Sequence, residues 1–102
     1  MTAAERQHLD AVASLGCIVC LNEGMGYAPA EIHHLKRNPE TGAKLGMSQR
    51  ASHFHTIPLC PTHHRTGGFG VAYHAGPRQF ESLYGTETEL WNQVRERLRG
   101  AA

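Results

Sequence analysis

The sequence predicts a small α+β domain in which two short strands and a helical turn form a ββα unit, flanked by one N-terminal helix and two C-terminal helices. Three observations support this fold class. Segments with helix-start signals lie at both ends of the 102 residues. Two short runs of strand-forming residues lie between them, at 30–36 and 54–60. A tight turn carrying a pair of cysteine or histidine residues precedes the first strand, and another follows the second.

The N-terminal part of the chain predicts a helix, a turn and the first strand. Residues 2–15 have a short apolar stripe at helical spacing, and Thr2 and Glu5 have the spacing of a capping box. We therefore expect a helix there, ended by the glycine that follows it. The segment GCIVCLNEGMG, residues 16–26, is predicted as a tight turn, and AEIHHLK, residues 30–36, as a strand.

The middle of the chain predicts a long loop, the second strand and a glycine-rich connection. Residues 38–52 are rich in glycine, serine and polar residues, which is typical of a loop. FHTIPLC, residues 54–60, is predicted as the second strand, and CPTHHRTG, residues 60–67, as a turn leading into a helical turn. Residues 67–76 lack the Lys-Ser/Thr ending of a phosphate-binding loop.

Two helices are predicted at the C-terminal end. The segment Pro77–Tyr84 begins with a proline, which suits the first turn of a helix. Thr86 and Glu89 repeat the capping-box spacing, so the last helix is expected to start at Thr86 and to end at Gly100. Its apolar face would consist of Leu90, Trp91, Val94 and Leu98.

Length and composition restrict the class of protein further. One hydrophobic core is expected at this length, so residues 1–102 are predicted to form a single domain. Only 7% of the residues are aromatic, and so lean a core often needs a staple such as a metal ion. No run of about 18 apolar residues occurs and the first residues include charges, so neither a membrane span nor a signal peptide is expected.

The charge distribution points to a polyanionic partner. The formal net charge is only +1, but residues 33–78 contain six lysine and arginine residues against a single acid, Glu40. Seven of the eight histidines lie in the same segment. A basic segment interleaved with histidines suits nucleic acid, whereas charge alone would favour an ordinary solvated surface.

Two pairs of metal-binding residue types predict a zinc site. Cys17 and Cys20 are three positions apart, and so are Cys60 and His63. Two such knuckles commonly build a tetrahedral zinc site, and three thiolates with one imidazole would make it closed and structural. An odd number of cysteines argues against a closed disulfide framework. Two alternatives stay open: reduced cysteines packed as small hydrophobic residues, and a zinc site in which His64 replaces His63.

Four further histidines have no role in this zinc site. They are His33, His34, His55 and His64. Adjacent residues on a strand point to opposite faces, so His33 and His34 cannot simply bind one ion side by side. Successive residues on a helix point about 100° apart, which separates His64 from His63. The number and pairing of these histidines indicate a second functional site.

The order and spacing of these residues resemble the HNH, or ββα-metal, endonucleases that carry a zinc staple. The matching residues are the pair Cys17 and Cys20, the strand pair His33-His34, His55 five residues before the third cysteine, the pair Cys60 and His63, and His64 directly after it. This motif covers about residues 17–66. The longer string from EIHHL through TIPLCPTHHR and YHAG to FESLYGTE resembles the phage-type branch of Ref-like RecA-dependent nucleases.

The resemblance implies a metal-dependent DNA endonuclease that hydrolyses phosphodiester bonds with a histidine-activated water. His34 would be the general base, and His33 and His64 would bind a catalytic ion, with His74 as a candidate third ligand. His55 stands where the family usually has Asn and would orient His34 or the scissile phosphate, or bind metal or phosphate itself. The second ion would be Mg²⁺, Mn²⁺ or Zn²⁺, and His33 in place of the usual Asp favours a transition metal.

The resemblance also implies partners. DNA phosphates would be contacted by basic residues of the middle segment, with Arg65 best placed for the scissile phosphate. These residues are Lys36, Arg37, Lys44, Arg50 and Arg65. A recombinase filament is a candidate second partner, and no membrane partner is expected. The protein would be phage-derived and recombination-related. It would act as a monomer in the bacterial cytoplasm. Two other hypotheses stay open: a non-catalytic zinc module that binds nucleic acid, and an interaction domain that has lost nuclease activity.

Overall fold

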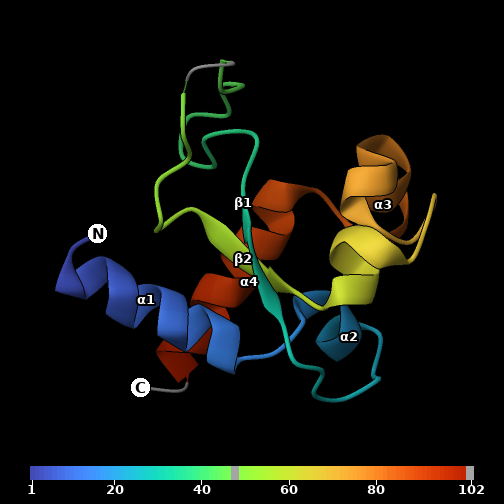
Figure 1. Ribbon diagram of the computed structural model, residues 1–102, viewed down its shortest axis with the longest axis horizontal. Helices are drawn as coiled ribbons and strands as arrows, with labels where there is room; N and C mark the ends of the chain where they lie inside the picture. Colours follow the sequence, from blue (N-terminus) through green and yellow to red (C-terminus); the bar gives the residue numbers. More distant parts are fainter. Residues whose placement is uncertain (47–48, 101–102) are drawn as a thin grey trace.

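A two-stranded antiparallel sheet lies at the centre of the protein, surrounded by helices (Figure 1). The computed structural model describes residues 1–46 and 49–100. The elements are, in order, α1 (Ala3–Ser14), α2 (Ile18–Asn22), β1 (Glu31–His34), β2 (Thr56–Leu59), the π-helix η1 (Thr62–Thr66), the 3₁₀ turn η2 (Tyr73–Ala75), α3 (Pro77–Tyr84) and α4 (Glu87–Gly100). The predicted α+β class is confirmed, as are the N-terminal helix and the two C-terminal helices, whereas α2 is an additional short helix before the strands.

The helix α1 lies within one residue of its predicted bounds. The Glu5 N–H donates to Thr2 Oγ1 at 3.1 Å and the Thr2 N–H donates to the Glu5 carboxylate at 2.7 Å, so the capping box is complete. Gly16 follows the helix with a φ of +78°, and a Cβ at this position would lie 2.7 Å from the Tyr27 ring. Glycine therefore permits the sharp turn that leads from α1 to the first cysteine.

The tight turn predicted for residues 16–26 is wrong in part, because Cys20 lies on a short helix, α2. Cys17 caps this helix, with its Sγ accepting the Cys20 N–H at 3.5 Å. Ile18 and Val19 are buried in the core. This burial stabilises a helix that would be too short to persist alone.

The strands are shorter than predicted, with four residues each, and β2 is buried along its whole length. His33 pairs with Ile57 across the sheet. His33 is buried while His34 is partly exposed, in agreement with the opposite faces expected for neighbours on a strand. The predicted loop at 38–52 is irregular in its described part, and positions 47–48 lie outside the described residues.

The segment after β2 completes the ββα unit with η1, and η2 follows the glycine-rich connection. The bounds of α3 agree with the prediction, and α4 starts one residue after Thr86. The second capping box is also confirmed, since Thr86 and Glu89 exchange hydrogen bonds of 2.9 and 3.1 Å. Both C-terminal helices thus begin where local sequence signals place them.

One hydrophobic core joins the helices to β2. The buried side chains of this core include Val12, Ile18, Leu35, Ile57, Leu59, Phe80, Leu90, Trp91 and Val94. The Trp91 Nε1–H donates to the Phe54 carbonyl at 3.0 Å, so its polar group is satisfied. No helix within residues 1–46 and 49–100 is long and apolar enough to cross a membrane.

Candidate metal and catalytic site

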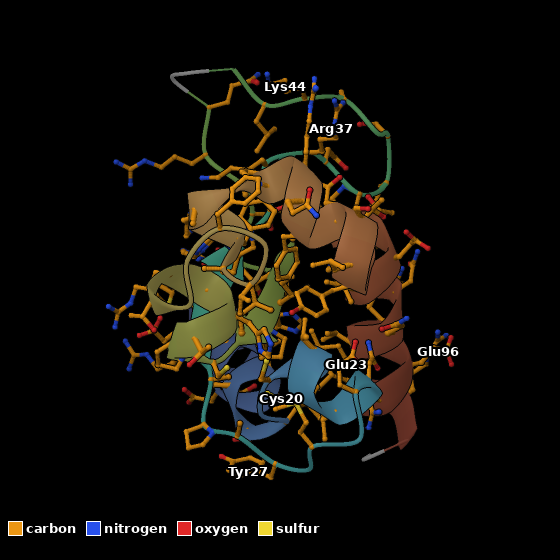
Figure 2. All side chains as sticks on the ribbon, turned by 90° about the vertical axis from the view of Figure 1, so that its right-hand side faces the viewer. Cys20, Glu23, Tyr27, Arg37, Lys44 and Glu96 are labelled. Atoms are coloured by element: carbon orange, nitrogen blue, oxygen red, sulfur yellow. The ribbon has the colours of Figure 1, made fainter. Side chains whose placement is uncertain are left out.

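Three cysteines and one histidine meet at the junction of α2 and η1. All four side chains are buried, and Cys20 projects from α2 (Figure 2). The sulfurs of Cys20 and Cys60 are 3.9 Å apart, and His63 Nδ1 lies 3.3–3.6 Å from the three sulfurs. Ligand atoms of one tetrahedral zinc ion lie about 3.5–3.8 Å from one another. Cys17, Cys20, Cys60 and His63 could therefore hold a metal ion such as zinc.

The protonation chemistry of this group also suits a cation. Burial, followed by the hydrogen bond to Cys17, raises the pKa of the Cys20 thiol to about 12. A thiolate there needs a compensating positive charge, which a divalent ion supplies. Burial lowers the pKa of His63, which favours the neutral imidazole that metal binding needs. His63, and not His64, meets the cysteines, so the arrangement agrees with the first of the two assignments considered.

His64 belongs to a second group of three imidazoles. His33 comes from β1, His64 from η1 and His74 from η2, and one ring nitrogen of each lies within 4.8 Å of the others. The Nε2 atoms of His64 and His74 are 3.0 Å apart. Burial is the main cause that lowers the pKa of both His33 and His74, which favours their neutral forms. Neutral imidazoles that converge in this way suit a divalent transition metal.

Carboxylates contact one ring nitrogen in two of these imidazoles. His33 Nε2 lies 2.6 Å from Glu87 Oε2, and both side chains are buried. His64 Nδ1 lies 2.9 Å from Glu31 Oε1. Arg65 donates to the same carboxylate at 2.7 Å and, followed by His64, lowers the pKa of Glu31 to about 2. Arg65 was expected to contact the scissile phosphate, but its charge is already paired with Glu31.

His34 lies on the opposite face of β1 from His33 and lines a cleft of about 790 Å³. Its Nε2 is 3.0 Å from Nδ1 of His53, which lies in the segment before β2. Burial, followed by the neighbouring His53, lowers the pKa of His34. A neutral imidazole with a fixed partner on one nitrogen is suited to accept a proton on the other.

The His55 carbonyl accepts the Leu35 N–H at 3.1 Å, but among the described residues the His55 side chain forms its hydrogen bond with Glu40 and not with His34. Its Nε2–H donates to Glu40 Oε1 at 2.9 Å, and its ring packs edge-on against Trp91 at 5.5 Å between centroids. Within the described part of the chain, the hydrogen-bond partner of the His34 ring is His53. The orienting role that the resemblance suggested for His55 therefore has no contact to support it.

The basic residues predicted to bind DNA separate into groups. Arg37 donates to the Gly42 carbonyl at 3.1 Å within the loop that follows β1. Figure 2 shows Arg37 and Lys44 together at one end of the molecule, away from Cys20. The cleft that contains His34 is lined by three of the predicted residues, Lys36, Lys44 and Arg50. These three are brought together by the fold, as a shared DNA-binding surface requires.

A comparison with protein families accounts for nearly the whole chain. The family model described as recombination enhancement, RecA-dependent nuclease matches residues 1–99. The chain belongs to this family. Membership makes it a nuclease that is connected with RecA and recombination, and supports the branch that its sequence resembles. A comparison with curated proteins finds no match.

The candidate site of this RecA-dependent nuclease includes residues that the sequence reasoning missed. Glu87 is 54 positions from His33, and an acid in the first turn of a helix is common enough to attract no notice. His53 lies outside the residues that carry the family resemblance. Glu31 carries a usable signal, because it lies two residues before His33 and therefore on the same face of β1.

Proposed function

We propose that this RecA-dependent nuclease is an HNH-type DNA endonuclease with one structural zinc ion and one exchangeable divalent ion. The observation that carries the proposal is the convergence of His33, His64 and His74 beside a separate, buried group of three cysteines and His63. A zinc-binding module without a catalytic role needs only the second of these groups. His63 belongs to the cysteine group and His64 to the histidine group. Because these two residues are neighbours in the chain, the two metal ions would be bound on either side of η1.

The structural zinc would be held by Cys17, Cys20, Cys60 and His63. These residues join two segments that are 40 positions apart, and a metal ion that closes such a loop stabilises the folded state. The same ion would immobilise η1, which carries His64 directly after His63. The staple would therefore also position a ligand of the exchangeable ion.

The exchangeable ion would be held by His33, His64 and His74, with Mg²⁺, Mn²⁺ and Zn²⁺ as the candidates. Nitrogen ligands favour the transition metals over Mg²⁺. When bound, the ion would stabilise the negative charge that develops on the scissile phosphate and on the leaving oxygen. Three protein ligands leave coordination positions for the substrate.

His34 would act as the general base. Its lowered pKa keeps the imidazole neutral near neutral pH, so that it can take a proton from the attacking water. Nε2 faces His53, which leaves Nδ1 to receive that proton. The water oxygen forms its bond to phosphorus, and the bond from phosphorus to the leaving sugar oxygen breaks.

The DNA backbone would lie across β1, with one strand in the cleft. In the described residues β1 pairs only with β2, so its other edge carries no strand. A phosphate bound along that edge would be approached from both faces of the sheet. His33 and His34 can then act on one phosphate although they lie on opposite faces. Lys36, Lys44 and Arg50 would bind neighbouring phosphates, which positions the DNA without reading its sequence.

Cleavage of supercoiled plasmid tests this proposal. Protein incubated with Mg²⁺, Mn²⁺ or Zn²⁺, with and without a RecA filament, is expected to nick or linearise the plasmid under at least one condition. His34→Ala is expected to slow cleavage about 10²- to 10⁴-fold while DNA binding is kept. His8→Ala is the matched control, because His8 packs on Phe54 outside both metal-binding groups.

Three results would count against parts of the proposal. An intact plasmid under every ion, with and without RecA, from protein that binds DNA would instead indicate a non-catalytic nucleic-acid-binding module. Cleavage that is unchanged in His34→Ala would reject this residue as the base. Metal analysis after dialysis is expected to find a tightly held zinc ion, and its absence would reject the staple.

A further inference from the structure

Two acidic side chains each contact one ring nitrogen of His33 and of His64. Glu87 Oε2 lies 2.6 Å from His33 Nε2, and Glu31 Oε1 lies 2.9 Å from His64 Nδ1. An ionised carboxylate only accepts hydrogen bonds, so each of these ring nitrogens must carry the hydrogen. A neutral imidazole carries one hydrogen, and its other nitrogen is then left with a free lone pair.

We propose that Glu87 and Glu31 are positioning residues that hold His33 and His64 in opposite tautomers, so that His33 Nδ1 and His64 Nε2 face the exchangeable ion. This inference rests on the proposed function, because it concerns the same ion. A carboxylate on the outer nitrogen fixes the orientation of the ring and makes the inner nitrogen a stronger ligand. The 3.0 Å separation of His64 Nε2 from His74 Nε2 agrees with the nitrogen assigned to His64.

The surroundings of Glu87 support a role toward His33. Glu87 is only 5% exposed. Its carboxylate is hydrogen-bonded to His33, a side chain that can carry a positive charge. The same carboxylate accepts the Lys36 N–H at 2.9 Å, so it is held from two sides. The Tyr73 ring packs on His33 at 4.4 Å between centroids, which restricts the imidazole further. Glu87 thereby connects the start of α4 to the end of β1.

Glu87 is assigned to positioning and not to direct metal binding because of its place in the cluster. Among the described residues, the group whose ligand atoms all lie within 4.8 Å of one another contains His33, His64 and His74 but not Glu87. The carboxylate contacts His33 without belonging to that group. Glu31 likewise contacts His64 without belonging to the group, and it also binds Arg65.

Metal titration provides the first test. Protein that retains its tightly held zinc is titrated with Mn²⁺ or Co²⁺ in a calorimeter, and both Glu87→Gln and Glu31→Gln are expected to bind the added ion about 10- to 100-fold more weakly. Glu89→Gln is the matched control, because Glu89 lies two positions further along α4 and Gln can also serve in its capping box. Unchanged affinity in both Glu87→Gln and Glu31→Gln would overturn the inference.

Nitrogen-15 NMR of the imidazole rings provides a second readout that needs no added ion. At about pH 8, where histidines are neutral, His33 is expected as the Nε2–H tautomer and His64 as the Nδ1–H tautomer. Finding His33 as the Nδ1–H form, or His64 as the Nε2–H form, would overturn the assignment even if Glu87→Gln proved unstable. This measurement also separates positioning from general stabilisation, which does not select a tautomer.

Failure of this inference can be told apart from failure of the proposed function. If the unmodified protein binds no exchangeable ion and cleaves no DNA, the proposed endonuclease is wrong. If it binds the ion and cleaves DNA, but the glutamine variants do so equally well, only the role of the two carboxylates is wrong. Activity loss without a change in metal affinity or tautomer would likewise count against positioning.

Discussion

The side chain next to His34 decides which of its ring nitrogens can take a proton. If His34 Nδ1 is to receive the proton from water, Nε2 must carry the hydrogen and donate it to a neighbour. His53 Nδ1, at 3.0 Å, is in place to accept it. We therefore propose for His53 the orienting role that the sequence resemblance had suggested for His55, which contacts Glu40 instead.

Substitutions of His53 test this role at the level of one atom. His53→Asn keeps an acceptor oxygen near the position of Nδ1 and is expected to cleave DNA at nearly the normal rate. His53→Gln, whose polar atoms reach the position of Nε2 instead, and His53→Ala are expected to lose about 10²-fold in kcat because the base is misplaced. Steady-state cleavage kinetics measure the effect, with KM and the affinity for the exchangeable ion expected to stay the same.

The pattern of the His53 variants distinguishes positioning from other roles. Equal rates in His53→Asn and His53→Ala would show that the acceptor atom is unimportant. An increase in KM with an unchanged kcat would indicate that His53 contacts the DNA and does not orient the base. A lower affinity for the exchangeable ion would indicate a distortion that extends across β1 to His33.

Sequence reasoning at the residue scale worked where the partners are neighbours in the chain. The pairs Cys17 with Cys20 and Cys60 with His63 are set by local turns, so their spacing predicts a metal site and the structure brings the four residues together. Local geometry also makes the neighbours His63 and His64 point in different directions, and in the structure they join different groups. The partner Glu87 lies 54 positions from His33, and only the packing of α4 against the strands brings them together.

At the scale of elements, the junction between α1 and α2 controls how the first two cysteines are presented. Gly16 has a φ of +78°, and a Cβ there would lie 2.7 Å from Tyr27 Cδ2 and 2.9 Å from the Ala28 carbonyl oxygen. Gly24 has a similar φ of +73°, but a Cβ at that position would have no neighbouring atom within 4 Å. These two glycines therefore share a backbone conformation and differ in their surroundings.

The two glycines give a matched pair of variants. Gly24→Ala is expected to lower the free energy of unfolding by about 1–2 kcal/mol, the cost of a left-handed conformation for a residue with a Cβ. Gly16→Ala is expected to lower the free energy of unfolding clearly more, because the Tyr27 ring and the Ala28 backbone must also move. Urea unfolding of the zinc-loaded protein measures both losses. Equal losses of unfolding free energy in the two variants would show that the segment around Tyr27 shifts at little energetic cost.

Helices with strong local signals were predicted well, whereas α2, which depends on burial in the core, was not. The capping boxes at Thr2 and Thr86 and the proline at the start of α3 act within one turn, so the bounds of α1, α3 and α4 follow from sequence. The helix α2 has no such signal. Its residues become helical because Ile18 and Val19 enter the core and Cys17 caps the turn.

At the scale of the whole molecule, the net charge of +1 conceals an uneven distribution. Lys36, Lys44 and Arg50 gather around the cleft that contains His34. Figure 1 shows the loop that carries Lys44 and Arg50 at the opposite end of the molecule from the end of α4, where Arg97 is exposed. DNA that is bound at the cleft should therefore contact the lysine and arginine residues there but not Arg97.

The salt dependence of DNA binding separates these cations. Each phosphate contact that is lost lowers the steepness of log K against log salt by about 1, so Lys44→Ala and Arg50→Ala are each expected to flatten the slope by about that amount. Arg97→Ala removes the same charge from the far end of α4 and is expected to leave the slope unchanged. Fluorescence anisotropy with a labelled duplex at several salt concentrations measures all three. Equal flattening by Arg97→Ala would mean that net charge, and not the cleft, governs binding, because only a general electrostatic attraction treats the two ends of the molecule alike.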